Sequence, residues 1–164
     1  MAGPRDMEDP MSFTIPQPLK VEHDHLHQDL SRAITQGGRT GEAARVVAQR
    51  LHAHFHSEED YALPPLGLLS ALLRGDVPPE DTAKAIGMAD RLEAELPRML
   101  AEHREIVAAL RDLTTAARDE GHDDTVAFAE ALVLHARTEE EVLYPATILL
   151  GRYLKLAQGD PQAD

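Results

Sequence analysis

Apolar residues recur along this chain at alternating steps of three and four positions, in four separate runs. The first run covers residues 19–33 and stops at Gly37-Gly38, and the second covers residues 41–73. The third covers residues 80–120, and the fourth follows Gly121. A mean step of about 3.5 residues is typical of helices that pack at shallow angles. The pattern predicts an all-α fold, an antiparallel up-down four-helix bundle with short connections.

Prolines and acidic residues mark where these helices bend or begin. Pro64-Pro65 predict a kink in the second helix and Pro97 a bend in the third, because proline removes a helical hydrogen bond. Asp123 or Asp124 is the expected N-cap of the fourth helix. A chain of 164 residues fits one domain. We expect a flexible arm over residues 1–18, the bundle over 19–157 and a C-terminal tail over 158–164.

Six polar residues occupy apolar positions of these runs. They are His23, His54, Glu58, His103, His135 and Glu139. Of the remaining histidines, His25, His52, His56 and His122 fall off the apolar face and His27 lies on its flank. Each Glu follows a His by four positions, so both side chains can point into the same interior volume.

The same residues form a repeated pattern. His54-x-x-x-Glu58-Glu59-x-x-x-x-Pro64 recurs 81 residues later as His135-x-x-x-Glu139-Glu140-x-x-x-x-Pro145, and Glu22-His23 recurs 80 residues later as Glu102-His103. A helical hairpin used twice would account for this. We therefore expect an internal pseudo-twofold repeat in which each half supplies two His and one Glu.

Two interpretations of the six residues compete: polar side chains tolerated at partly exposed ends of the bundle, or ligands of a metal centre. Burying unpaired carboxylates costs several kcal/mol each, against a stability of ~5 to 15 kcal/mol, so the set favours a metal. The chain has no Cys, which leaves His, Asp and Glu as strong ligands. Six ligands exceed one tetrahedral zinc and suit two metals with shared carboxylates. We expect two iron ions, with manganese or zinc as lesser alternatives.

Several neighbouring residues have less certain roles on spacing alone. Glu59 and Glu140 could be spare ligands or bases that support the ligands, but solvated surface charges explain them better, since adjacent helix positions point about 100° apart. Glu22 and Glu102 are interpreted as surface partners. Tyr61 fits core packing and a hydrogen bond to a bridging ligand equally well. An apolar shell controlling access is expected from Leu26, Leu51, Ile106, Leu132 and Val142.

Charge and hydropathy exclude some partners. The chain carries 29 acidic and 16 basic residues, a net charge of -13, which argues against nucleic acid and anionic membranes. No apolar run reaches the roughly 18 residues that span a bilayer, and the N-terminus lacks a signal-peptide pattern. A cytoplasmic location is expected.

From about residue 20 to 156 the chain resembles the hemerythrin-like, or HHE cation-binding, domains. In that family four helices contribute His, His-x-x-x-Glu, His and His-x-x-x-Glu to a non-haem di-iron centre. The resemblance implies that His23, His54, His103 and His135 are terminal ligands and that Glu58 and Glu139 bridge the irons. Oxygen-carrying hemerythrins place His-x-x-x-His on the third helix, whereas Val107 follows His103 here. The set is more similar to bacterial HHE proteins linked to oxygen or nitric oxide sensing, peroxide chemistry, and repair or supply of iron centres.

Three functions remain open at this point. The first is a di-iron protein that binds or reacts with oxygen, nitric oxide or peroxide, as a binding module, a sensor or a slow redox enzyme, with a redox protein as its partner. The second is iron storage, delivery or iron-centre repair, which would require an iron-acceptor protein as partner. The third is a bundle stabilised by zinc or by no metal.

Overall fold

The computed structural model describes residues 13–159, which form helices and the turns between them. The arm expected over residues 1–18 and the tail expected over 158–164 therefore lie largely outside the described residues. The α-helices are α1 (Gln17–Thr35), α2 (Gly38–Ser57), α3 (Leu69–Arg74), α4 (Pro79–Glu120), α5 (Asp123–Thr138) and α6 (Tyr144–Gly159). Two π-helical segments, η1 (Glu58–Ala62) and η3 (Glu139–Leu143), and the 3-10 helix η2 (Pro64–Leu68) complete the elements.

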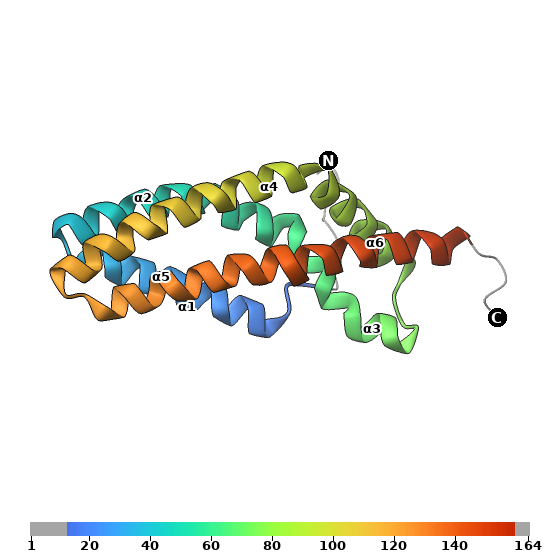
Figure 1. Cartoon of the computed structure of the whole chain (residues 1–164). Helices are drawn as coiled ribbons and strands as arrows, with labels where there is room; N and C mark the ends of the chain where they lie inside the picture. The colour runs from blue at the N-terminus through green and yellow to red at the C-terminus, as the bar shows by residue number, and fades with distance from the viewer. Residues whose placement is uncertain (1–12, 160–164) are drawn as a thin grey trace, which may run out of the picture.

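The long helices pack side by side along one axis (Figure 1). Helix α2 lies against α1 and α4, and α5 lies against α1 and α4, so the four pack around a shared interior. The α5, η3 and α6 segments run on as one long rod (Figure 1). The predicted four-helix bundle is confirmed.

The two halves turn at the same end of the bundle, where one carboxylate joins them. Gly121 ends α4 at a φ of 77°. The preceding Glu120 accepts hydrogen bonds from the backbone amides of Arg39 and Thr40, at 3.0 and 2.9 Å, and from the Thr40 hydroxyl at 2.6 Å. Because Glu120 satisfies free amides at its first turn, α2 begins at Gly38, earlier than expected.

The predicted N-cap of the fourth helix is wrong. His122 occupies that position without a side-chain cap bond, and Asp123 and Asp124 lie in the first turn of α5. Acidic side chains there still interact favourably with the helix dipole.

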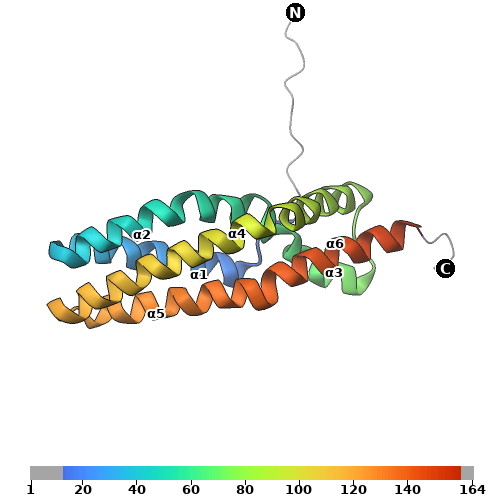
Figure 2. The same ribbon diagram turned by 45° about the horizontal axis from the view of Figure 1, so that its top comes forward.

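Helix α4 changes direction part-way along its 42 residues, as Figure 2 shows. Pro97 lies inside this helix, and its missing amide explains the bend. The N-terminal part of α4 packs closely on α6: a Cβ added to Gly151 would lie 2.3 Å from the Cβ of Ala89. Phe13 is buried in the apolar cluster beside this contact, together with Leu68 and Leu154.

In both copies of the repeat the α-helix changes to a π-helical segment at the glutamate of the His-x-x-x-Glu pair. Segments η1 and η3 begin at Glu58 and Glu139 and end two residues before Pro64 and Pro145. In η1 the amide of Leu63 bonds the carbonyl of Glu58, five residues back, at 2.9 Å. A proline collides with the carbonyl four residues before it in a regular helix, and a wider turn relieves that collision.

The π-helical turn in the second copy shifts the buried face by one residue. Val142 was expected to face the interior, but it is 56% exposed, and Leu149 one helical repeat later is 61% exposed. Tyr144, Thr147 and Leu150 are buried instead. The assignment of Val142 to an apolar shell was therefore wrong, because it assumed an unbroken α-helical period.

Candidate metal centre

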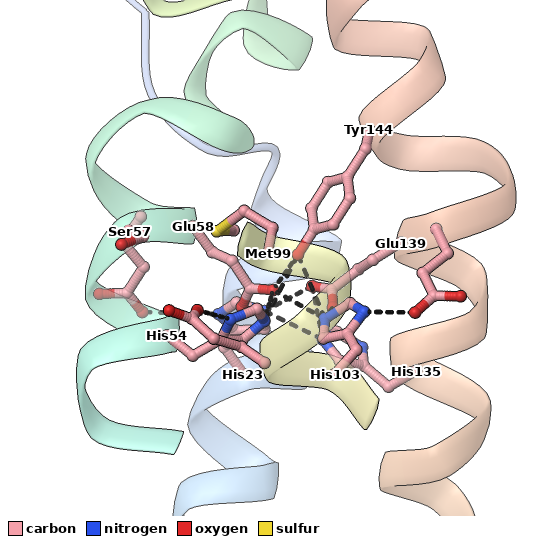
Figure 3. A network of polar contacts seen from close by, with 12 residues as sticks. His23, His54, Ser57, Glu58, Met99, His103, His135, Glu139 and Tyr144 are labelled. Atoms are coloured by element: carbon pink, nitrogen blue, oxygen red, sulfur yellow. Dashed lines mark hydrogen bonds and ion pairs between the residues drawn. The ribbon is translucent and has the colours of Figure 1, made fainter. Parts of the chain in front are cut away.

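Six side chains meet in one layer across the bundle (Figure 3). Helix α1 supplies His23, α2 His54, α4 His103 and α5 His135, while the first residues of η1 and η3 supply Glu58 and Glu139. None of these six side chains is more than 3% exposed. The structure thus brings together all six residues selected from the sequence.

The six residues divide into two overlapping groups of potential ligands. His23 and His135 form one group with both glutamates, and His54 and His103 form the other with the same two glutamates. In each group the ligand atoms lie within 4.8 Å of one another. Two cations placed in these groups would share both carboxylates, as in a bridged di-metal site.

The atoms nearest the centre are the ring Nε2 atoms and the carboxylate oxygens. Within each His-x-x-x-Glu pair, His54 Nε2 lies 2.8 Å from Glu58 Oε1 and His135 Nε2 lies 2.9 Å from Glu139 Oε1. His103 Nε2 is 3.3 Å from Glu139 Oε2. The pairs are not isolated from each other, because each glutamate also faces histidines of other helices.

Without a cation, the electrostatics of this layer demand positive charge. Burial lowers the pKa of the His103 imidazole, but hydrogen bonds with Glu139 and Glu58 outweigh it and raise the pKa to about 10. The pKa of His135 rises to about 9 against the same effect of burial, chiefly through Glu139. Burial also raises the pKa of Glu139, yet the facing histidines hold it well below its usual value.

Buried polar atoms that make no hydrogen bond also indicate that this layer lacks positive charge. Glu58 Oε2, Glu139 Oε1 and His23 Nδ1 make no hydrogen bond of suitable geometry among the described residues, although His135 Nε2 lies 2.9 Å from Glu139 Oε1. Unpaired buried oxygen acceptors are rare because each costs about 1 to 3 kcal/mol. Two of the three are carboxylate oxygens that face the centre, so the donor set fits a pair of metal ions.

Four further glutamates face the outer nitrogens of the four histidines. The Nδ1–Oε distances are 2.7 Å for His54–Glu102, 2.9 Å for His103–Glu140, 3.1 Å for His135–Glu22 and 3.5 Å for His23–Glu59. Each glutamate comes from a different helix or segment than its histidine. A carboxylate on Nδ1 fixes the ring so that Nε2 points inward.

For two of the four glutamates this finding corrects the sequence interpretation: Glu140 is more than a solvated surface charge, and Glu102 is more than a surface partner. Glu102 is 28% and Glu140 36% exposed, so they are partly accessible while bonded to a histidine. Arg98 in turn pairs with Glu102. The signal was present in the sequence, because every one of the four glutamates is adjacent to a candidate ligand in the repeated pattern.

Tyr144 is a residue of the centre that the sequence analysis missed. Its hydroxyl donates a hydrogen bond to Glu58 Oε1 at 2.6 Å and lies 3.3 Å from His103 Nε2 (Figure 3). Burial raises its pKa, which keeps the phenol protonated. Tyr61, the tyrosine considered from the sequence, contacts the Met99 sulfur and Arg98 instead.

The equivalent of Tyr144 in the first copy of the repeat is Leu63, so the centre is not symmetric. The hydroxyl of Tyr144 also lies 3.5 Å from His54 Nε2, which places it beside the His54–His103 group. The other group has an apolar neighbour: the ring of His23 stacks on Phe55 with centroids 4.9 Å apart.

Apolar clusters enclose the layer on both sides. Toward the turn end lie Leu26, Leu51, Ile106 and Leu132, four of the five residues expected to form an apolar shell. On the opposite side lie Leu63, Leu92 and Met99 together with Tyr61 and Tyr144. Among the remaining histidines, His25, His27, His52 and His56 are exposed and His122 is half-buried, all outside the layer.

A family model described as the hemerythrin HHE cation binding domain matches residues 19–147. The chain belongs to this family. No curated protein and no solved structure gives a significant match.

All six residues of the buried centre fall within the stretch that matches the hemerythrin HHE domain. Val107, which follows His103 by one helical turn, is half-buried and offers no ligand atom. No helix among residues 13–159 combines the length and the hydrophobicity of a membrane-spanning segment.

Proposed function

We propose that this hemerythrin HHE domain holds two iron ions and binds or reacts with a small ligand such as oxygen, nitric oxide or peroxide. The observation that carries the proposal is the pair of buried ligand groups that share Glu58 and Glu139. Imidazole and carboxylate donors without thiolate suit iron, with manganese or zinc as alternatives. Bound iron would supply one-electron redox chemistry and coordination positions for an exogenous ligand.

In this proposal the four histidines are terminal ligands, two for each metal, and the two glutamates bridge. The outer carboxylates hold the rings through Nδ1 and raise the basicity of the ligating Nε2 atoms. The outer carboxylates therefore position the histidine ligands. Together with the two bridging glutamates, they also favour a cation of higher charge.

The enclosure of the centre supports a small ligand. All six donor side chains are at most 3% exposed, and apolar clusters cover both sides of the layer. A diatomic molecule or peroxide can reach such a site through side-chain motion, whereas a large substrate would require the helices to separate. Enclosure also opposes rapid exchange of the metal, which disfavours iron delivery as the main role.

Tyr144 makes the two metal positions unequal. Its phenol can donate a hydrogen bond near the His54–His103 group, while Phe55 covers His23 in the other. A polar exogenous ligand is therefore better accommodated beside His54 and His103.

The proposal is tested by purifying the full chain without oxygen, measuring its metal content and recording absorption spectra before and after adding oxygen, nitric oxide or peroxide. We expect about two irons per chain, tightly held, and a spectral change with at least one of the three reagents. Iron that passes readily to an apo acceptor without a spectral change would support delivery instead. Zinc, or no transition metal, would contradict a redox function.

Matched variants test the ligand assignment. Glu58→Ala and Glu139→Ala should each lower the iron content, because each removes a carboxylate shared by both metals. His25→Ala and His56→Ala are the controls, since both side chains are exposed and outside the layer. Equal loss of iron from all four variants would refute the assignment.

A further inference from the structure

A groove between α4 and α5 has a composition unlike the rest of this acidic protein. Its cavity volume is about 440 Å³. The side chains of Arg104, Arg111 and Arg137 line it, together with the apolar side chains of Val107, Val133 and Ala136. The groove thus combines three guanidinium groups with an apolar lining.

The three arginines have no carboxylate partner among residues 13–159. Most other arginines in that part of the chain form ion pairs, for example Arg91 with Asp60 and Arg152 with Glu93. The net charge is -13, so acidic partners are abundant elsewhere on the chain. Three unpaired arginines lining one groove therefore create a local positive potential.

One carboxylate also lines the groove, but it is already engaged. Glu140 Oε1 lies 2.9 Å from His103 Nδ1, and His103 itself reaches the groove. With three arginines and one glutamate, the lining keeps an excess of positive charge. The inner end of the groove thus touches the outer side of the metal centre.

The lining favours a particular chemical class of ligand. A guanidinium group forms paired hydrogen bonds to phosphate or carboxylate oxygens. The valine and alanine side chains suit an apolar or aromatic body, and a volume of about 440 Å³ matches sites for small molecules. Arg104 and Arg111 are seven residues apart, about 10 Å along the helix, which accommodates a ligand longer than a bare phosphate ion.

We propose that this groove binds a small organic anion, an apolar or aromatic body that carries a phosphate or carboxylate group. The arginines bind the oxyanion, and Val107, Val133 and Ala136 contact the body. Nothing in this inference depends on which metal the centre holds or on the proposed redox function.

Isothermal titration calorimetry on the full chain tests the inference with four probes. Phenyl phosphate and benzoate carry both parts of the expected ligand and distinguish a phosphate from a carboxylate. Inorganic phosphate carries only the anion, and phenol only the ring. We expect one saturable site for phenyl phosphate or benzoate, with weaker binding of inorganic phosphate and of phenol.

Variants locate the site. Arg137→Gln and Arg104→Gln should each weaken binding about tenfold or more, since each removes a charge-assisted hydrogen bond. Arg45→Gln is the matched control, because Arg45 is exposed on α2 and has no ion pair among residues 13–159. It should leave the affinity within about twofold.

Three results would overturn the inference. The first is the absence of saturable binding for both phenyl phosphate and benzoate. The second is equal weakening by Arg45→Gln, which would reveal a general charge effect. The third is tighter binding of a glutamate-rich peptide, added as a fifth probe, than of either aromatic anion, which would make the groove a surface for an acidic protein segment.

Discussion

Replacing Glu102 by Gln should weaken metal binding by about 10- to 100-fold, although Glu102 is not one of the six inner residues. Its Oε2 accepts a hydrogen bond from His54 Nδ1 at 2.7 Å, the shortest of the four outer contacts. Gln keeps the size of the side chain but removes its charge, so the imidazole becomes less basic and its orientation less constrained. The predicted loss corresponds to about 1.4 to 2.8 kcal/mol of binding free energy.

The four outer contacts predict a graded series. The Nδ1–Oε distance is 2.9 Å for Glu140, 3.1 Å for Glu22 and 3.5 Å for Glu59, and the last pair makes no hydrogen bond. The effect of the Gln substitution should therefore fall in the order Glu102, Glu140, Glu22, Glu59. For Glu59, which is 46% exposed, we expect less than about a threefold change because solvent screens the interaction.

Competition between the metal-free protein and a chelator of known affinity measures this series. Glu141→Gln serves as the control, because it removes the same charge from an exposed position of η3, the segment that carries Glu140. If Glu141→Gln weakened binding as much as Glu102→Gln, the loss would reflect net charge alone. An effect of Glu59→Gln equal to that of Glu102→Gln would refute the link between these distances and metal affinity.

Three further substitutions test other parts of the structure. Tyr144→Phe removes a buried donor to a carboxylate and should lower the unfolding free energy of the metal-free protein by about 2 kcal/mol in urea titrations; an unchanged value would exclude that bond. Bonds from the Thr40 hydroxyl and the first amides of α2 hold the pKa of Glu120 at about 2, below its usual 4.5. Glu120→Gln should therefore destabilise the protein above pH 4.5, and the difference should shrink as the pH falls through about 2; a difference that keeps its full size at pH 2 would contradict this. Gly151→Ala would favour an isolated helix by about 1 kcal/mol, but here it should lower the melting temperature, because the new Cβ would lie 2.3 Å from Ala89. A higher melting temperature would show that α4 and α6 can separate at little cost.

The six inner residues could be selected from the sequence because they interrupt a regular apolar period. His23, His54, His103 and His135 each stand where the period requires a buried residue, and each is buried. The apolar period correctly predicted the buried positions as far as Glu58 and Glu139, because each glutamate directly follows an uninterrupted α-helix. The bundle followed from the same regularity.

After Glu139, in the second copy of the repeat, the apolar period no longer predicted which residues are buried. After the π-helical turn of η3 the buried residue is Tyr144, the fifth after Glu139, whereas an unbroken α-helical period predicted Val142, the third. The proline pattern after both ligand pairs, Pro64 and Pro145, was the available signal for a disturbed turn. The period alone could not show that the turn would widen.

Contacts between helices could not be predicted from the spacing of residues along the chain. The roles of Glu102 and Glu140 depend on histidines of neighbouring helices, and an angle of about 100° between adjacent positions does not prevent a long side chain from reaching them. Arg104 of α4 and Arg137 of α5 likewise line one groove only because the two helices pack against each other. Such pairings depend on how the helices are set against each other, which the spacing along one helix does not determine.

The central claim is that six residues hold two metal ions in the middle of the bundle. Anomalous X-ray scattering from crystals of the iron-loaded chain, collected at the iron edge, tests it most directly. The account predicts two strong peaks per chain, one beside His23 and His135 and one beside His54 and His103, both next to Glu58 and Glu139. A single peak, or peaks confined to the exposed histidines outside this layer, would contradict it.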